Sequence, residues 1–378
     1  MKIVHLTPDL NFAIKFVLPI AEFQSVDGNE VTICTHSNEY WASGQDFESI
    51  RLEYRQFRFV KLNLKIQLNA FIYLQSVGKL IRELRLIDPD IIISHTSLDS
   101  FIPLIVSRFV TNAKLVYFNH GVPFLGYGFP LRTIFKFIEV INLRTAHSTL
   151  TIGQSMKACL TPLVSDNKSV ILIPPGSACG IQLITSDYEK IVRMRTETRH
   201  ALGISKDEQI VIYVGRPVKR KGFFDLLEAW DAFKDASNYR LMLVGPAETD
   251  RVRLNKRLSS NVHFLGYQSD PTPFYLVADV LCIPSHHEGL GYCYIEASAA
   301  GCVPICSNIP GPTDFVKHGE TGMTCRRGDQ QSIADSISIM FSDKQLRERL
   351  ARNAFLQALS FERTALVPKI NATITTIV

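Results

Sequence analysis

Two glutamates, Glu288 and Glu296, stand eight positions apart in the stretch HHEGLGYCYIEASAAGCVP, residues 286–304. Gly289 and Gly291, which lie between them, let the backbone approach a ligand closely. A helix that begins near Gly291 would offer free amides to a phosphate. A carboxylate has only acceptors to offer, so each glutamate suits the hydroxyls of a sugar or a ribose. Chance also supplies such pairs, and surface residues without a ligand are the alternative.

A second charged group lies in the stretch GRPVKRKG, directly after the predicted strand QIVIYVG. Arg216 stands just past the strand end, and Lys221 stands where the next helix begins. Cations beside a helix N-terminus suit an anion, and a diphosphate is the ligand that this arrangement favours. A solvated basic turn is the alternative.

The elements that must position these residues alternate along the first half of the chain. Helical stretches separate or follow β-rich runs, which we expect at residues 2–7, 30–36, 90–95 and 114–120. Such alternation predicts a parallel sheet with helices on both faces.

A segment with two prolines and two glycines, PPGSACG, interrupts this pattern near residue 175. A second alternating series follows it, with strands expected at 209–215, 240–245, 262–266, 279–285 and 303–307. The expected fold class is therefore α/β, with two facing Rossmann-like domains and a cleft between them. We place the domains at 1–174 and 175–356, and we expect a helix in 357–378 that packs back onto the first domain. Ligands of such sheets lie at the carboxyl ends of the strands.

The composition is that of a globular protein, with 46% hydrophobic and 20% charged residues in 378. No stretch gives about 18 uninterrupted apolar residues, and the first residues do not fit a signal peptide, so we expect a cytoplasmic protein without a membrane span. The eight cysteines form no C-x-x-C pair, which predicts buried free thiols.

The positive charge is concentrated between residues 51 and 88, a segment called the basic stretch below. Three acids there oppose eight basic residues, which are Arg51, Arg55, Arg58, Lys61, Lys65, Lys79, Arg82 and Arg85. Our hypothesis is that this stretch contacts an anionic membrane face or a polyanion, and a solvated helix face is the alternative.

Several motifs together resemble the nucleotide-sugar domain of the retaining glycosyltransferases of family four, which have the GT-B fold. They are GR-x4-KG, E-x7-E and PG-x-x-D-x-x-x-x-G-x-TG, and the similarity is close over about residues 195–360. The first half is similar chiefly in YFNHGVPF. The enzymes that the chain resembles most build bacterial surface polysaccharide or lipid-linked glycans.

The resemblance implies a role for each matching residue. Arg216 and Lys221 would neutralise the donor diphosphate, Glu288 would contact the transferred sugar, and Glu296 would bind the ribose. His120, from the first domain, would lie near the transferring sugar and completes the expected catalytic set of His120, Arg216, Lys221 and Glu288. Tyr267 and Gln268 fall at the base pocket, and the remaining donor contacts would be Gly215, Gly289, Leu290, Gly291 and Tyr292.

The expected function is therefore transfer of a sugar, with retention, from a UDP- or GDP-sugar to a hydroxyl on a glycan or lipid-linked acceptor. No cofactor, metal or nucleic acid is expected, and an anionic membrane at the cytoplasmic face is a hypothetical partner. A nucleotide-sugar epimerase or hydrolase of the same fold and a non-catalytic nucleotide-sugar-binding protein remain alternatives. Nucleic-acid binding through residues 51–85 is a third, and it would depend steeply on salt.

The chain departs from the family pattern at two places. The loop after the first strand, TPDLNFAIKF, has no glycine where the family has a glycine-rich loop, which puts acceptor binding there in question. Gln182 stands where the linker motif normally ends in an aspartate.

Overall fold

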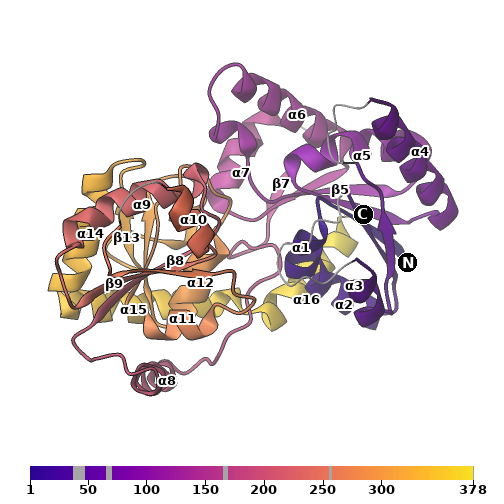
Figure 1. Cartoon of the computed structure of the whole chain (residues 1–378). Helices are drawn as coiled ribbons and strands as arrows, with labels where there is room; N and C mark the ends of the chain where they lie inside the picture. The colour runs from indigo at the N-terminus through magenta and orange to yellow at the C-terminus, as the bar shows by residue number, and fades with distance from the viewer. Residues whose placement is uncertain (37–46, 65–69, 165–168, 255–257, 378) are drawn as a thin grey trace. The chain divides into compact units, whose positions relative to one another are not determined.

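The structure, a computed structural model, describes all residues except 37–46, 65–69, 165–168, 255–257 and 378. The chain divides into two compact units (Figure 1). Unit 1 comprises Met1–Gly180 and Arg363–Val378, and unit 2 comprises Ile181–Glu362. Each unit is built on one parallel sheet with helices on both faces, as the sequence predicts.

Unit 1 has a seven-stranded sheet in the order β3-β2-β1-β4-β5-β6-β7. Its strands are almost continuously apolar and buried, which is typical of parallel sheets covered on both faces. They are β1 (Lys2–Thr7), β2 (Glu30–Thr35), β3 (Arg58–Lys61), β4 (Ile91–His95), β5 (Lys114–Asn119), β6 (Ser148–Thr151) and β7 (Val170–Leu172).

The last helix of the chain, α16 (Arg363–Thr376), packs on α2 of unit 1, so the predicted return of the C-terminal helix is confirmed. The helical segment after β1 is divided into α1 (Leu10–Phe12), a π-helix (Ala13–Val17) and α2 (Leu18–Val26). The other helices of unit 1 are α3 (Phe47–Glu53), α4 (Ala70–Ile87), α5 (Ser97–Val110), α6 (Leu131–Thr145) and α7 (Gln154–Leu160), with 3-10 turns η2 (Pro123–Leu125) and η3 (Thr161–Leu163).

Unit 2 has a six-stranded sheet in the order β10-β9-β8-β11-β12-β13. The strands are β8 (Gln209–Val214), β9 (Tyr239–Val244), β10 (Val262–Gly266), β11 (Val280–Ile283), β12 (Val303–Ser307) and β13 (Met323–Cys325). The helices are α8 (Tyr188–Ala201), α9 (Phe223–Trp230), α10 (Glu248–Arg253), α11 (Thr272–Val277), α12 (Tyr292–Ala299), α13 (Pro312–Phe315), α14 (Gln330–Ser342) and α15 (Lys344–Ala358). Three short 3-10 turns complete the unit: η4 (Lys219–Lys221), η5 (Asp231–Phe233) and η6 (Leu359–Phe361).

Both sheets reverse their strand order at one point, between β1 and β4 in unit 1 and between β8 and β11 in unit 2. Loops that leave the carboxyl ends of two such strands diverge and form a crevice where ligands bind. The candidate residues of each unit should therefore be sought after these strands.

Two further sequence predictions bear on the site. All eight cysteines are free and six of them are buried, which confirms the prediction of free thiols. Within the described residues, no helix is both long enough and apolar enough to cross a membrane.

Candidate functional site

The centre of the candidate site in unit 2 is an ion pair between Lys221 and Glu288. Lys221 ends η4, which follows β8, and Glu288 lies in the loop after β11, so the pair sits at the reversal point of the sheet. The Nζ of Lys221 donates to a carboxylate oxygen of Glu288, and the side chains of Lys221 and Glu288 are only 16% and 13% exposed. Burial disfavours the Glu288 carboxylate, but Lys221, Arg220 and the Gly289 N–H outweigh it and lower its pKa. Both partners are therefore charged.

Glycines allow the loops around this pair to touch. Gly222 begins α9 with φ +68°, and a Cβ there would collide with the Pro284 carbonyl group. Gly311 has φ +99°, and a Cβ there would collide with the Gly289 carbonyl oxygen, so the PG-x-x-D loop lies directly against the Glu288 loop. A side chain at either glycine would push the charged loops apart.

Polar contacts also fix the loop that carries Glu288. His286 Nε2 lies 2.7 Å from a carboxylate oxygen of Asp225 on α9. Arg220 donates to the His287 carbonyl at 3.2 Å and accepts from the His286 N–H at 2.8 Å through its own carbonyl. The structure thus gives both His286 and His287 contacts that hold this loop in place. Asp225 and Arg220 lie on neighbouring elements and carried no sequence signal.

The other predicted donor residues of unit 2 lie on the same or neighbouring loops. Gly215 and Arg216 directly follow β8, and the Arg216 carbonyl accepts from the Tyr213 hydroxyl at 2.6 Å. Gly291, with φ +78°, begins α12 beside the Tyr294 ring, and Leu290 and Tyr292 are buried.

Glu296 and the predicted base pocket lie further from the ion pair. Glu296, in the second turn of α12, accepts from the Tyr275 hydroxyl at 3.3 Å. Tyr267 and Gln268 follow β10, the edge strand, which is separated from β8 by β9. Tyr267 is exposed, and Gln268 donates to the Leu265 carbonyl. The structure thus joins Lys221 and Glu288 directly, whereas Glu296 contacts Tyr275 and Gln268 contacts its own loop.

His120 of unit 1 ends a chain of hydrogen-bonded side chains that crosses three adjacent strands. His120 Nε2 lies 3.0 Å from His95 Nδ1, and His95 Nε2 lies 3.0 Å from His5 Nδ1. His5 Nε2 in turn lies 2.8 Å from Gln24 Oε1. His5 is in β1, His95 ends β4 and His120 follows β5, so this histidine chain lies across the reversal point of the first sheet.

The histidine chain is neutral. Burial lowers the pKa of His5 to about 4 and holds that of His95 well below its usual range. Burial also lowers the pKa of His120, whose ring is half-buried. A neutral imidazole has one donor and one acceptor nitrogen. With the Gln24 carbonyl oxygen facing His5, we infer that each ring carries its proton on Nε2 and that His120 has an acceptor at Nδ1.

A buried carboxyl group holds the turn that carries His120. Glu139 of α6 accepts from Tyr117 at 2.7 Å and from the Asn119 amide at 2.9 Å, and it also accepts from the Ser97 hydroxyl. The Asn119 side chain in turn bonds both the N–H and the carbonyl of Gly121. Burial raises the pKa of Glu139 to about 7 despite these donors.

The segment that lacks the family's glycine loop packs beside His120. Asp9 caps α1 by accepting from the Phe12 N–H at 2.7 Å. The Phe12 ring meets the His120 ring edge-on with a centroid separation of 4.7 Å, and Phe16, in the π-helix, lies 6.1 Å from it. Phe12 and Phe16 therefore lie beside His120, in the segment where the family has its glycine-rich loop.

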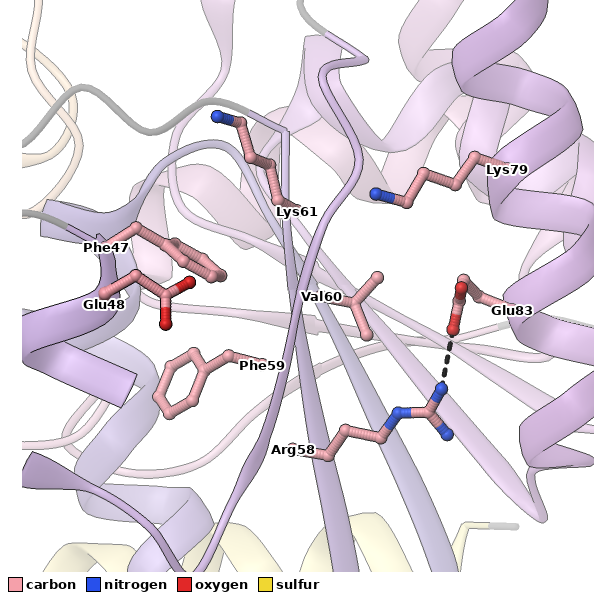
Figure 2. A pocket seen from close by; sticks show the side chains of 8 residues that line it. All are labelled: Phe47, Glu48, Arg58, Phe59, Val60, Lys61, Lys79 and Glu83. Carbon is pink, nitrogen blue, oxygen red and sulfur yellow. Dashed lines mark hydrogen bonds and ion pairs between the residues drawn. The ribbon is translucent and has the colours of Figure 1, made fainter. Parts of the chain in front are cut away.

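The basic stretch is not a uniformly cationic surface. A cavity of about 600 Å³ lies on it, with Lys61 and Lys79 at its wall (Figure 2). Two carboxylates, Glu48 and Glu83, also line this cavity, and Glu83 pairs with Arg58 at 2.7 Å. Arg51 pairs with Glu48 and Arg82 with Glu83. Lys65 lies outside the described residues.

Comparison with known proteins identifies the class first. The fold is GT-B: Anabaena Alr3699/HepE, solved in complex with UDP and glucose, superposes with a TM-score of 0.75 at 19% identity, over 100% of both chains. Residues 194–357 match the model of glycosyl transferases group 1, and residues 15–177 match that of Glycosyltransferase Family 4. The chain belongs to glycosyltransferase family 4.

Two curated relatives narrow the comparison. The capsular polysaccharide biosynthesis glycosyltransferase CapM of Staphylococcus aureus is 31% identical over 57% of this chain and 58% of its own length. The Campylobacter jejuni N,N'-diacetylbacillosaminyl-diphospho-undecaprenol alpha-1,3-N-acetylgalactosaminyltransferase is 23% identical over 94% of this chain and 93% of its own. The chain thus spans little more than half of the first relative and nearly all of the second.

Proposed function

We propose that this protein is a retaining, metal-independent glycosyltransferase that moves a sugar from a UDP- or GDP-sugar to a hydroxyl acceptor. The product would be a surface polysaccharide or a lipid-linked glycan. The observation that carries the proposal is the Lys221–Glu288 pair, held at the reversal point of the sheet by Gly222 and Gly311.

The charges of this site suit a leaving diphosphate. When the bond between the anomeric carbon and the diphosphate oxygen breaks, the electron pair goes to the diphosphate. Lys221 and Arg216 stabilise that charge together with the amides at the start of α12, and one such donor contributes roughly 3–4 kcal/mol. In this proposal, these cations take the role that a metal ion has in other glycosyltransferases.

Glu288 has a role that depends on the donor. Without donor it neutralises Lys221; when a diphosphate engages Lys221, the carboxylate becomes free to accept hydrogen bonds from the transferred sugar. From unit 1, His120 contributes its Nδ1 acceptor to a sugar hydroxyl. In the same-face attack proposed here, the acceptor oxygen bonds to the anomeric carbon as the bond to the diphosphate breaks, and the acceptor proton passes to the leaving phosphate.

The relatives support the donor and acceptor classes. HepE was solved with UDP and glucose, CapM is named for capsular polysaccharide, and the Campylobacter enzyme is named for a diphospho-undecaprenol acceptor. The proposal includes a reaction at the cytoplasmic face of a membrane and peripheral contact with anionic lipid.

The first test is calorimetric binding of UDP, GDP, ADP and their common sugar conjugates, with magnesium and with EDTA. We expect one nucleoside diphosphate to bind equally well under both conditions. Binding that requires magnesium would contradict the metal-independent site. Sugar release without acceptor would favour a hydrolase, and donor binding without turnover over a broad acceptor panel would favour a binding protein.

Substitution of Glu288 by Gln separates sugar contact from diphosphate binding. The amide cannot neutralise Lys221, so the free nucleoside diphosphate should bind as well as in the wild type or more tightly. Turnover should fall about a hundredfold, because the sugar loses a charged acceptor. Parallel loss of turnover and of diphosphate affinity would rule out the sugar role.

A further inference from the structure

Helix α6 buries two polar side chains and exposes apolar ones. Glu139 and Asn142 are fully buried, whereas Phe137 is 63% exposed. At 3.6 residues per turn, Phe137 points away from both Glu139 and Asn142, and Ile134, at the flank of the helix, is also exposed. A helix at the surface of a protein in water normally has the opposite arrangement.

Hydrogen bonds fix this orientation. The Asn142 amide donates to the Ser97 carbonyl at 2.7 Å, and Glu139 accepts from Ser97, Tyr117 and Asn119. Rotation of α6 to bury Phe137 would break these hydrogen bonds. The loss of these bonds would cost more free energy than the burial of Phe137 would gain. The outward apolar face is therefore imposed by the inner face.

The apolar surface continues into the loop before the helix. Phe129 is 88% exposed, and Tyr127 and Leu131 are exposed as well. We call Tyr127, Phe129, Leu131, Ile134 and Phe137 together the α6 surface. Single exposed apolar side chains are ordinary, but five within eleven residues form a patch of the kind that marks an interaction site.

The charges around the α6 surface have one sign. Arg132 and Lys136 are exposed among its apolar side chains. Glu139 is the only acid between Asp99 and Asp166, and it is buried. Apolar side chains interleaved with cations complement the acyl boundary and the headgroups of an anionic lipid leaflet.

We propose that the α6 surface docks on a bilayer that contains anionic lipid. It is distinct from the basic stretch, where carboxylates neutralise Arg51, Arg58 and Arg82. Phe129 and Phe137 enter the interface between headgroups and acyl chains, and Arg132 and Lys136 contact lipid phosphates. Docking is independent of sugar transfer and can be tested without substrate.

The test is flotation of the full chain with vesicles of phosphatidylcholine alone or mixed with phosphatidylglycerol. We expect the wild type to float only with the mixed vesicles. The double variant Phe129→Ser/Phe137→Ser should weaken binding about a hundredfold. The matched control is Phe109→Ser, because Phe109 is 85% exposed but precedes β5, whereas Phe129 follows that strand. This control should float like the wild type.

Charge-reversal variants show which cations contribute to vesicle binding. Arg132→Glu/Lys136→Glu should weaken flotation about tenfold or more, whereas Lys61→Glu/Lys79→Glu in the basic stretch should leave it unchanged. Loss of flotation only in the Lys61→Glu/Lys79→Glu variant would overturn the proposal. Flotation that does not depend on phosphatidylglycerol would overturn it as well. A stable dimer that fails to float and is dissociated by Phe137→Ser would assign the surface to a second copy instead. Retained nucleotide binding and melting temperature confirm that each variant is folded.

Discussion

The two units place different chemistry at the same topological position. At the reversal point of unit 2, Lys221 and Glu288 are both charged, and the pKa of Glu288 is lowered. At the reversal point of unit 1, His5, His95 and His120 are all neutral, because burial lowers their pKa values. A charged pair suits a diphosphate, whereas a neutral chain of imidazoles suits hydroxyl groups. The same fold thus supplies both halves of the proposed reaction.

The largest effect should follow when Lys221, the cation of the charged pair in unit 2, is replaced. Lys221→Met should weaken diphosphate binding by a factor of about 100 to 1,000 and leave nucleoside binding nearly unchanged. It also leaves Glu288 unpaired, which should lower the free energy of unfolding by up to about 3 kcal/mol. Calorimetry and denaturant unfolding measure the two effects.

A double variant separates these two consequences. Lys221→Met/Glu288→Gln should recover most of the lost stability, because no unpaired charge remains, but it should not recover diphosphate binding. If the double variant bound diphosphate like the wild type, Lys221 would have no phosphate role and the contrast between the units would fail.

Per pH unit, a smaller effect should appear in unit 1 when the pH falls. The unfolded chain protonates each histidine near pH 6.5, whereas folded His5 resists protonation down to about pH 4. The stabilisation is therefore complete above pH 6.5 and is lost as the pH falls, by about 1.4 kcal/mol per pH unit for each buried histidine. Hydrogen exchange of amides in β1, β4 and β5 measures this for unit 1 alone.

The variant His5→Gln should reduce that slope by one proton. The absolute stability of this variant is expected to fall as well, so the diagnostic quantity is the slope of unfolding free energy against pH. An unchanged slope would mean that His5 titrates normally in the folded protein and that the histidine chain is not neutral.

The smallest effect should come from the end of the histidine chain. Gln24→Leu removes the acceptor of His5 Nε2 and should cost about 1 kcal/mol, with loss of the uniform Nε2–H tautomer in nitrogen-15 NMR spectra. Gln24→Glu is the control, since its carboxylate keeps the acceptor, preserves the proton order and raises the pKa of His5. Identical histidine spectra in the wild type and the Leu variant would show that Gln24 does not set the tautomers.

Local pattern predicted much of unit 2 because its motifs lie on loops after strongly apolar strands. The strand runs and the glycines around Glu288 are visible in a single window of sequence. The contact of Glu288 with Lys221 was not predictable in this way, because 67 residues separate the two. The short strands β3 and β13, of four and three residues, have too few apolar positions to stand out.

Unit 1 was harder because its polar groups are satisfied only by distant partners. His5 and His95 lie within buried strand residues, and nothing local indicates that the strands pair and bring the rings together. The outward face of α6 was missed for a related reason. Glu139 and Asn142 resemble solvent-facing positions until Ser97, Tyr117 and Asn119 are placed beneath them. The signal that was available is three histidines near the carboxyl ends of three predicted strands.

The inverted polarity of α6 has a practical consequence for the protein in solution. An apolar face with Arg132 and Lys136 among its side chains is kept from self-association partly by repulsion between equal charges. Salt screens that repulsion and strengthens apolar association. Purified protein should therefore aggregate more readily as ionic strength rises, while low salt or a mild detergent should keep it dispersed.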